Sequence, residues 1–154
     1  MGTRIVMGLA AAVVVAGCGG GPPRPAASLQ PLRFLVKEKP KVVEKGQMGA
    51  TLRIMLEVMN PGPHPVCLRR LNIDASINGT SLGWTNASPK TETPSGGHAR
   101  VPVNFSVSYL SGGMSIISAL GADSVTCSLQ GTTVISCADA AYAPSPTEFP
   151  ISVK

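Results

Sequence analysis

Residues 52–82 constrain the fold most strongly, because apolar residues recur at every second position in both halves of this stretch. A period of two is typical of a β-strand with one buried face. In the second half the intervening residues Asn72, Asp74 and Ser76 are polar, which assigns them to a solvated face. The predicted buried sets are Leu52, Ile54, Leu56 and Val58, and Leu71, Ile73, Ala75 and Ile77.

Two turn signals bound these predicted strands. The first strand runs into Asn60-Pro61-Gly62-Pro63, where proline removes backbone donors and glycine and asparagine tolerate turn geometry. The second strand ends at Asn78-Gly79, a strong hairpin signal, after which residues 81–84 return as a third strand. The pattern predicts antiparallel β-structure with the rhythm of a sandwich.

The same residues carry a family resemblance. An alternating strand that runs into N-P-x-P, followed by a strand of the form L-x-x-L-x-I-x-A-x-I-N-G, resembles the type 2 late embryogenesis abundant family, also called the water-stress and hypersensitive-response domain. The similarity covers roughly residues 35–154, and it implies a non-catalytic stress-protection or binding module. The matching residues are Asn60, Pro61, Pro63, Leu68, Leu71, Ile73, Ile77, Asn78 and Gly79.

The N-terminus resembles a bacterial lipoprotein signal. Met1-Gly2-Thr3-Arg4 is positively charged, and the uncharged, mostly apolar run 5–15 is roughly 16 Å long as a helix, about half of a ~30 Å hydrocarbon core. This length favours a signal peptide over a membrane span. The run is followed by Val15-Ala16-Gly17-Cys18, which resembles the lipoprotein processing box. By this resemblance residues 1–17 are removed and Cys18 is acylated.

Residues 18–30 are predicted to be a tether, because glycine and proline with almost no large apolar residue bury too little surface to fold. Residues 31–154 form the predicted domain. Its charged run 37–45 is expected to be a solvated edge or loop, with contact to anionic lipid as the alternative. By similarity to enteric lipoproteins, Gly19 after Cys18 argues for the outer membrane, facing the periplasm.

The spacing of apolar residues predicts the remaining strands and the helix. Residues 31–36 and 149–153 are short strands, and residues 84–97 are a loop rich in Ser, Thr, Pro and Gly. Val101, Val103, Phe105, Val107 and Tyr109 share one phase of a strand in which Pro102 indicates an edge position or a bulge. Residues 111–121 change to a helical period, with Ser111 as a cap and Met114, Ile117, Ala119 and Leu120 at helical spacing. The expected fold is all-β: an antiparallel Ig-like or fibronectin-like sandwich of about seven strands with one short helix.

Residues 125–137 admit two interpretations. A hairpin turning at Gly131 would place Cys127 opposite Cys137, within disulfide reach. A single strand with a glycine bulge would separate these cysteines by ~33 Å. We expect the single strand, because Leu129, Gly131 and Thr132 resemble the L-x-G-T of the family, and therefore no bond between Cys127 and Cys137. Cys67 shares the parity of the buried positions on its strand, so its thiol is expected to be sheltered or paired.

No chemical motif suggests catalysis. His64 and His98 lack a cysteine or carboxylate at ligand spacing, and Asp74 and Asp123 are isolated, which argues against catalytic residues, a metal site or a cofactor. The net charge is +5, and apart from the run 37–45 the basic residues are scattered without aromatic interleaving, which argues against nucleic-acid binding. The expected function is a membrane-anchored stress-protection or binding lipoprotein of the cell envelope, which contacts the bilayer through acylated Cys18 and binds an unidentified protein or small apolar ligand. The alternative is a scaffold lipoprotein of an envelope secretion or assembly complex.

Overall fold

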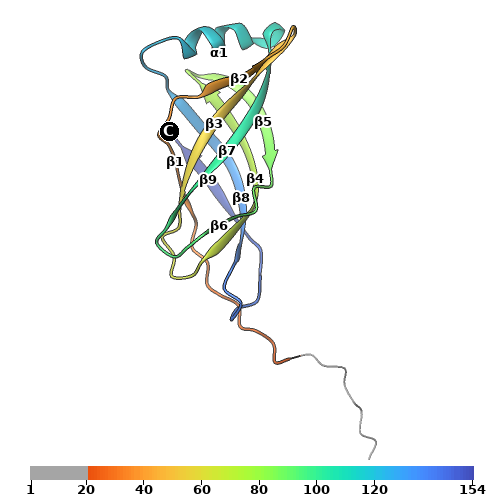
Figure 1. The fold of residues 1–154 in the computed structure, drawn as a ribbon, viewed down its shortest axis with the longest axis vertical. Helices are drawn as coiled ribbons and strands as arrows, with labels where there is room; N and C mark the ends of the chain where they lie inside the picture. The colour runs from red at the N-terminus through yellow and green to blue at the C-terminus, as the bar shows by residue number, and fades with distance from the viewer. Residues whose placement is uncertain (1–20) are drawn as a thin grey trace, which may run out of the picture.

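The computed structural model describes residues 21–154, which form a β-sandwich of nine strands with one α-helix (Figure 1). The all-β prediction is confirmed, and each of the seven predicted strands is present. Two further short strands lie in segments that we expected to be loop or solvated edge. They are β2 (Lys41–Lys45) and β6 (Thr91–Thr93).

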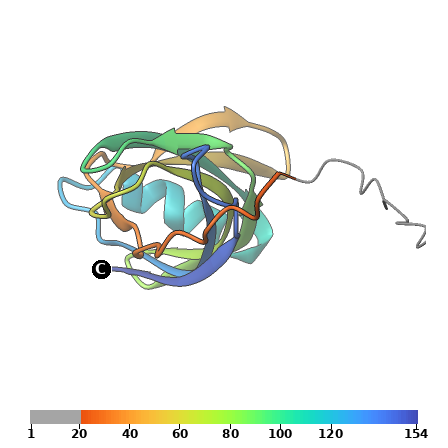
Figure 2. The same cartoon turned by 90° about the horizontal axis from the view of Figure 1, so that it is seen from below.

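The strands form two antiparallel sheets, which Figure 2 shows as two layers viewed along the strands. In sheet 1, β3 (Gly49–Met59) is central, with β7 (His98–Ser108) on one side and β1 (Arg33–Val36) and β2 sharing the other. In sheet 2, β4 (Val66–Ile77) pairs with β8 (Cys127–Cys137) on one side and with β5 (Thr80–Ala87) and β6 on the other. Outside β8 lies β9 (Thr147–Val153).

The core lies between the inner faces of the two sheets. The predicted phases are confirmed, since the eight side chains predicted to be buried in β3 and β4 are at most 1 % exposed. The inward side chains of β7 are buried as well. Pro102 lies on the outer face of β7, which is an edge strand because it pairs only with β3. Together these three strands supply most of the core: Leu52, Ile54, Leu56, Val58, Leu71, Ile73, Ala75, Ile77, Val101, Val103, Phe105 and Val107.

The proline turn connects the two sheets, since β3 and β4 pair with different neighbours. Asn60 is 1 % exposed, and its Nδ2 donates to the carbonyl oxygens of His64 (2.8 Å), Thr93 (3.2 Å) and Pro94 (3.2 Å). Its Oδ1 accepts from the Gly62 N–H at 3.0 Å. Asn60 therefore joins the β3–β4 turn to the β6–β7 turn, which gives this motif residue a structural role.

The hairpin predicted at Asn78-Gly79 joins β4 to β5. Both residues have positive φ, 48° and 82°, as the favoured two-residue hairpin turn requires. The register shifts opposite Ala75 and Ser76, so that one extra residue enters β5. As a result Leu82 is buried, whereas Trp84 lies on the outer face and is 62 % exposed.

The expectation for Cys67 was wrong. The register of β4 against β8 shifts between Leu68 and Arg70, so Arg69 is an extra residue that reverses the alternation. Upstream of this bulge the inward positions are Val66 and Leu68, and Cys67 lies half-buried on the outer face. A bulge of this kind depends on the partner strand, which a period of two within one strand cannot reveal.

The single strand predicted over residues 127–137 is confirmed. β8 runs from Cys127 to Cys137 with unbroken pairing at Gly131, so the predicted glycine bulge was wrong. Gly131 is instead required by close packing, because a Cβ built there would lie 2.0 Å from the carbonyl oxygen of Asn72. Its φ of 152° also favours glycine. The two cysteines are at opposite ends of the strand, and Cys67, Cys127 and Cys137 are all free thiols.

The predicted helix is α1 (Gly113–Leu120), which covers one end of the sandwich (Figure 1). Its N-cap is Gly112; Ser111 instead belongs to the preceding 3₁₀ turn η1 (Tyr109–Ser111), so the predicted cap was wrong. Ile116 is buried in the core, whereas Met114 is 58 % exposed. No helix in the described part of the chain is long and apolar enough to cross a membrane.

Candidate functional site

The predicted lipidation site Cys18 and signal peptide 1–17 lie outside the described residues. The described chain reaches the sandwich at the end opposite α1 (Figure 1). There the Ala143 N–H donates to the Pro25 carbonyl oxygen at 2.9 Å, and Ala26 forms an isolated bridge with Ala143. Contacts between the chain and the domain therefore begin several residues before position 31, where we expected the tether to end.

The strand edges on the two sides of the sandwich differ. On one side the Thr85 hydroxyl of β5 donates to the Asn104 carbonyl oxygen of β7 at 3.1 Å, which joins the sheets. On the other side β1 pairs only with β3 and β9 pairs only with β8. Among the described residues no backbone hydrogen bond joins β1 to β9. The outer edges of these two strands therefore form an open seam.

Two cavities follow this seam, with volumes of about 460 and 330 Å³. Leu35, which is 40 % exposed, lines both of them, so we treat them as one feature and call it the seam groove. Its walls mix apolar side chains with polar and charged ones, and the polar groups predominate in the larger cavity, at the end nearer α1. The lining residues are Leu32–Pro40, Asp123, Val125–Cys127 and Pro150–Lys154.

Cys127 lines the seam groove, but its thiol is not activated as a nucleophile. Burial raises the pKa of its thiol, because desolvation disfavours the charged thiolate. The thiolate is the reactive form of cysteine, so a raised pKa makes this thiol less reactive at neutral pH. Cys127 therefore contributes shape and apolar surface to the groove.

The charged run 37–45 is largely compensated by neighbouring groups. Lys37 Nζ lies 2.8 Å from Glu57 Oε1, and Glu38 binds both Arg100 (3.1 Å) and Lys41 (3.7 Å). The Lys39 ammonium donates to the carbonyl oxygen of Ala122, which connects the segment after β1 to the end of α1. The run includes the edge strand β2, which agrees with the expected solvated edge, and contact of its exposed lysines with anionic lipid stays a prediction.

The histidines and aspartates occupy separate places. His64 packs its ring on Tyr142, with centroids 4.5 Å apart, and His98 Nδ1 lies 3.2 Å from Glu57 Oε1. Asp74 lies on the outer face of sheet 2, and Asp123 lies beside the seam groove. Within residues 21–154 no three His, Cys, Asp or Glu side chains are close enough together to hold a metal ion.

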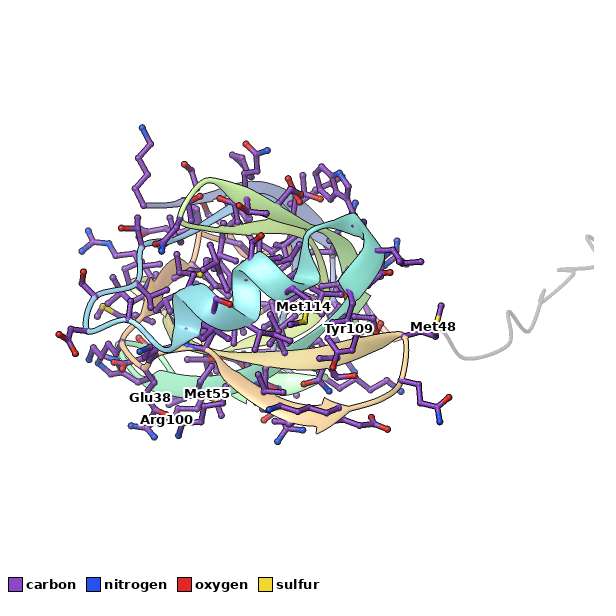
Figure 3. All side chains as sticks on the ribbon, turned by 90° about the horizontal axis from the view of Figure 1, so that it is seen from above. Glu38, Met48, Met55, Arg100, Tyr109 and Met114 are labelled. Atoms are coloured by element: carbon purple, nitrogen blue, oxygen red, sulfur yellow. The ribbon has the colours of Figure 1, made fainter. Side chains whose placement is uncertain are left out.

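A second exposed apolar feature lies at the end covered by α1. Met48, Leu110 and Met114 are 67 %, 84 % and 58 % exposed, and we call them the α1-end patch. The Tyr109 N–H donates to the Met48 carbonyl oxygen at 3.0 Å, and Figure 3 shows Met48, Tyr109 and Met114 at this end. Sequence reasoning missed this patch, because Met48 and Leu110 belong to turns that carry no period.

Sequence reasoning also missed the residues of the seam groove. The one residue that could have indicated the groove is Leu35. It is out of phase with the inward residues Leu32 and Phe34, so β1 carries an apolar side chain on its solvent-exposed face. The pairing that leaves both β1 and β9 with a free edge is a property of the tertiary structure, and no local pattern encodes it.

No protein-family profile matches the chain, and no curated protein matches it. Solved structures do resemble it. A structural-genomics target named SoR45 is 11 % identical, with 83 % of this chain and 85 % of that one covered and a TM-score of 0.49. A protein from Archaeoglobus fulgidus is 12 % identical over 82 % and 98 %, with a TM-score of 0.42. A protein from Arabidopsis thaliana, solved in solution, is 14 % identical over 94 % and 91 %, with a TM-score of 0.41.

Proposed function

We propose that this protein is a lipid-anchored, non-catalytic binding module of the bacterial cell envelope that protects other proteins during desiccation or osmotic stress. The observation that carries the proposal is the seam groove, which has both apolar and charged walls and lies between two strand edges without partners among the described residues. The resemblance to type 2 late embryogenesis abundant proteins supports the link to water stress. The order of charged start, apolar run and Cys18 supports the anchor.

The groove suits an extended apolar segment of a partly unfolded protein. Such a segment offers backbone donors and acceptors to a free strand edge and apolar side chains to the pockets beside it. Loss of water unfolds proteins and exposes segments of this kind, which pair with one another and aggregate. Occupation of the groove would delay that aggregation without any covalent chemistry.

The anchor fits the point at which the chain enters the domain. From Cys18 to Pro25 the chain spans at most ~25 Å when fully extended, at up to ~3.6 Å per residue. The end of the sandwich that receives the chain is therefore held near the bilayer. Three acyl chains at Cys18 would bind firmly, because each buried CH₂ contributes ~0.8 kcal/mol. We propose the outer membrane, facing the periplasm, as the location.

Replacement of Cys18 tests the anchor. We expect Cys18→Ala to leave uncleaved or mislocalised precursor and to abolish incorporation of labelled palmitate, whereas the wild type is labelled and fractionates with membranes. If the wild type incorporates no label and both proteins fractionate alike, the lipoprotein proposal is wrong.

A matched pair of surface variants tests the groove. Leu35→Asp introduces a charge at the point that both groove cavities share, and Leu110→Asp introduces the same charge at the α1-end patch. Both side chains are exposed, so both variants are expected to fold. We expect the wild type and Leu110→Asp to reduce light scattering by a test enzyme after drying and rehydration, and Leu35→Asp to fail. Equal protection by both variants would exclude the groove as the binding site.

The α1-end patch favours the alternative function, a scaffold lipoprotein of an envelope complex. The patch lies at the end of the sandwich opposite the tether, where a partner protein has free access (Figure 1). A scaffold role predicts a specific partner that co-purifies with the wild type and with Leu35→Asp but not with Leu110→Asp. It also predicts no loss of desiccation survival on deletion of the gene. The two variants thus give opposite results under the two functions.

A further inference from the structure

The outer face of sheet 2 carries a feature that neither the fold nor the proposed function uses. Trp84 is the single tryptophan of the chain, and its side chain is 62 % exposed on β5. An exposed indole leaves a large apolar surface in water, and such a surface indicates a binding site more strongly than an exposed polar side chain does. The bulge in β5 directs Trp84 outward, because residue 84 would share the buried phase of Leu82 without it.

Trp84 belongs to a row of side chains that crosses the whole sheet. Trp84 pairs with Asp74, Asp74 pairs with Gln130, and Gln130 pairs with Ser152, so four strands contribute neighbouring residues to one outer row. At about 4.8 Å between strands the row is about 14 Å wide. Flanking rows add further small polar side chains, and together we call these residues the sheet 2 platform. Its members are Trp84, Asp74, Gln130 and Ser152; Asn86, Asn72 and Thr132, with Pro150 at the end of that row; and Ser81, Ser76 and Ser128.

Hydrogen bonds within the platform orient its central carboxylate. Asp74 Oδ1 accepts from the Ser81 hydroxyl at 3.2 Å, and Asp74 Oδ2 accepts from Gln130 Nε2 at 3.4 Å. The hydroxyl oxygens of Ser76 and Ser128 lie 2.6 Å apart. A shallow depression of about 170 Å³ lies over this part of the platform and is lined by Asp74, Ser76, Ser128–Gln130 and Ser152–Lys154. Polar atoms at its surface retain lone pairs and protons for a ligand.

The composition of the platform selects among ligand classes. Its three rows hold one carboxylate and no lysine or arginine. Arg69, Arg70 and Lys90 line a separate cavity, and Lys154 lies at the rim of the depression, so a phosphate-rich ligand such as a nucleic acid finds no cation within the rows themselves. Apart from Pro150 the rows hold no aliphatic side chain, so a large apolar protein surface finds little to contact. A flat indole beside amide, carboxylate and hydroxyl groups instead complements a neutral ligand that has an apolar face and a rim of hydroxyl groups.

We propose that the sheet 2 platform binds a carbohydrate, with one pyranose ring stacked on Trp84 and its hydroxyl groups bound by Asp74 and Gln130. A sugar ring presents C–H groups on its face, which pack on the indole, and hydroxyl groups at its edge, which donate to the carboxylate and accept from the amide. The ligand class is a neutral oligosaccharide. The inference is independent of the lipid anchor. The platform shares only residues of β9, such as Ser152, with the seam groove, and Trp84, Asp74 and Gln130 do not line that groove.

Tryptophan fluorescence measures binding at this site directly, because Trp84 is the only tryptophan. The full chain, purified in a detergent without a sugar headgroup, is titrated with chitotetraose, cellotetraose and maltotetraose. We expect a saturable change in emission with at least one of the three. Asp74→Ala is expected to weaken that binding at least about tenfold, since it removes a charged hydrogen-bond acceptor at the surface. Arg53→Ala, on the outer face of sheet 1, is the matched control and is expected to bind as the wild type does.

Three results would overturn the inference. The first is an emission spectrum that none of the three oligosaccharides changes in a saturable way. The second is equal affinity of the wild type and Asp74→Ala, with circular dichroism confirming that both are folded. The third is tighter binding of a single-stranded oligonucleotide than of any of the sugars, which would identify stacking on Trp84 by bases instead.

Discussion

The outer faces of the two sheets differ more than any other pair of regions in this molecule. On sheet 1 charged groups pair across the strands: Lys37 and His98 both contact Glu57, and Arg100 contacts Glu38. Figure 3 shows Glu38, Met55 and Arg100 together at this face. On sheet 2 the platform around Trp84 holds one carboxylate among amides and hydroxyls.

This difference arises although the inner faces of the two sheets follow one rule. Both present aliphatic side chains at every second position, and burial of those side chains supplies the main favourable free energy of folding. The outer positions are free of that constraint. On sheet 1 they carry paired charges, which keep a surface solvated but contribute little to stability when exposed. On sheet 2 the platform positions carry one carboxylate among amides, hydroxyls and an indole, which is the basis of the carbohydrate proposal.

The largest expected effect on stability comes from comparing one substitution on each face of β4. Ile73→Asp places a carboxylate without a partner in the core, where Ile73 is 0 % exposed, and is expected to cost more than about 4 kcal/mol and to unfold the domain. Asn72→Asp makes a similar change one residue away on the outer face and is expected to leave the fold intact. Circular dichroism and urea unfolding measure both. Equal tolerance at the two positions would mean that the assignment of inner and outer faces is wrong.

A smaller effect is expected where β4 and β8 approach most closely beneath the platform. Gly131→Ala places a methyl group 2.0 Å from the carbonyl oxygen of Asn72, so the two strands must separate, at a cost of about 3 kcal/mol in the free energy of unfolding. The matched control is Gly46→Ala, whose added Cβ meets its nearest atom at an ordinary 3.5 Å. Denaturant midpoints of the two variants should differ clearly; coincident midpoints would exclude close strand packing as the reason for this glycine.

The smallest expected effect concerns the ion pairs of sheet 1. The hydrogen bond from Lys37, followed by the other charges near it, holds the pKa of the Glu57 carboxyl below its usual value. A lowered pKa in the folded state means that the stabilisation is present above the unfolded carboxyl pKa and is lost as the pH falls through the lower folded value. Urea midpoints of the wild type and Lys37→Ala should therefore differ slightly at neutral pH and converge in acid, once the pH is below the lowered pKa of Glu57. A difference that persists in acid would mean that Lys37 acts through packing of its alkyl chain.

The local pattern of the sequence determined which residues form strands and which side chains of most strands are buried. An alternation such as Leu52 to Val58 is a property of a few consecutive residues, so it is readable without knowledge of the partner strand. The same holds for the Asn78-Gly79 turn, whose backbone angles depend on these two residues, and for the short helix. The continuous strand from Cys127 to Cys137 was predicted on a different basis: its alternation also fitted a hairpin, and the resemblance of Leu129, Gly131 and Thr132 to the L-x-G-T of the family favoured the single strand.

Only the tertiary structure decided how those strands pair, and with that it decided the candidate sites. The short strands β2 and β6 exist because β3 and β4 offer them an edge, and the bulges that turn Cys67 and Trp84 outward depend on the register of neighbouring strands. The seam groove requires that β1 and β9, far apart in sequence, both end a sheet at the same side. These features are set by contacts over long sequence separations, and an alternation within a single strand carries no information about them.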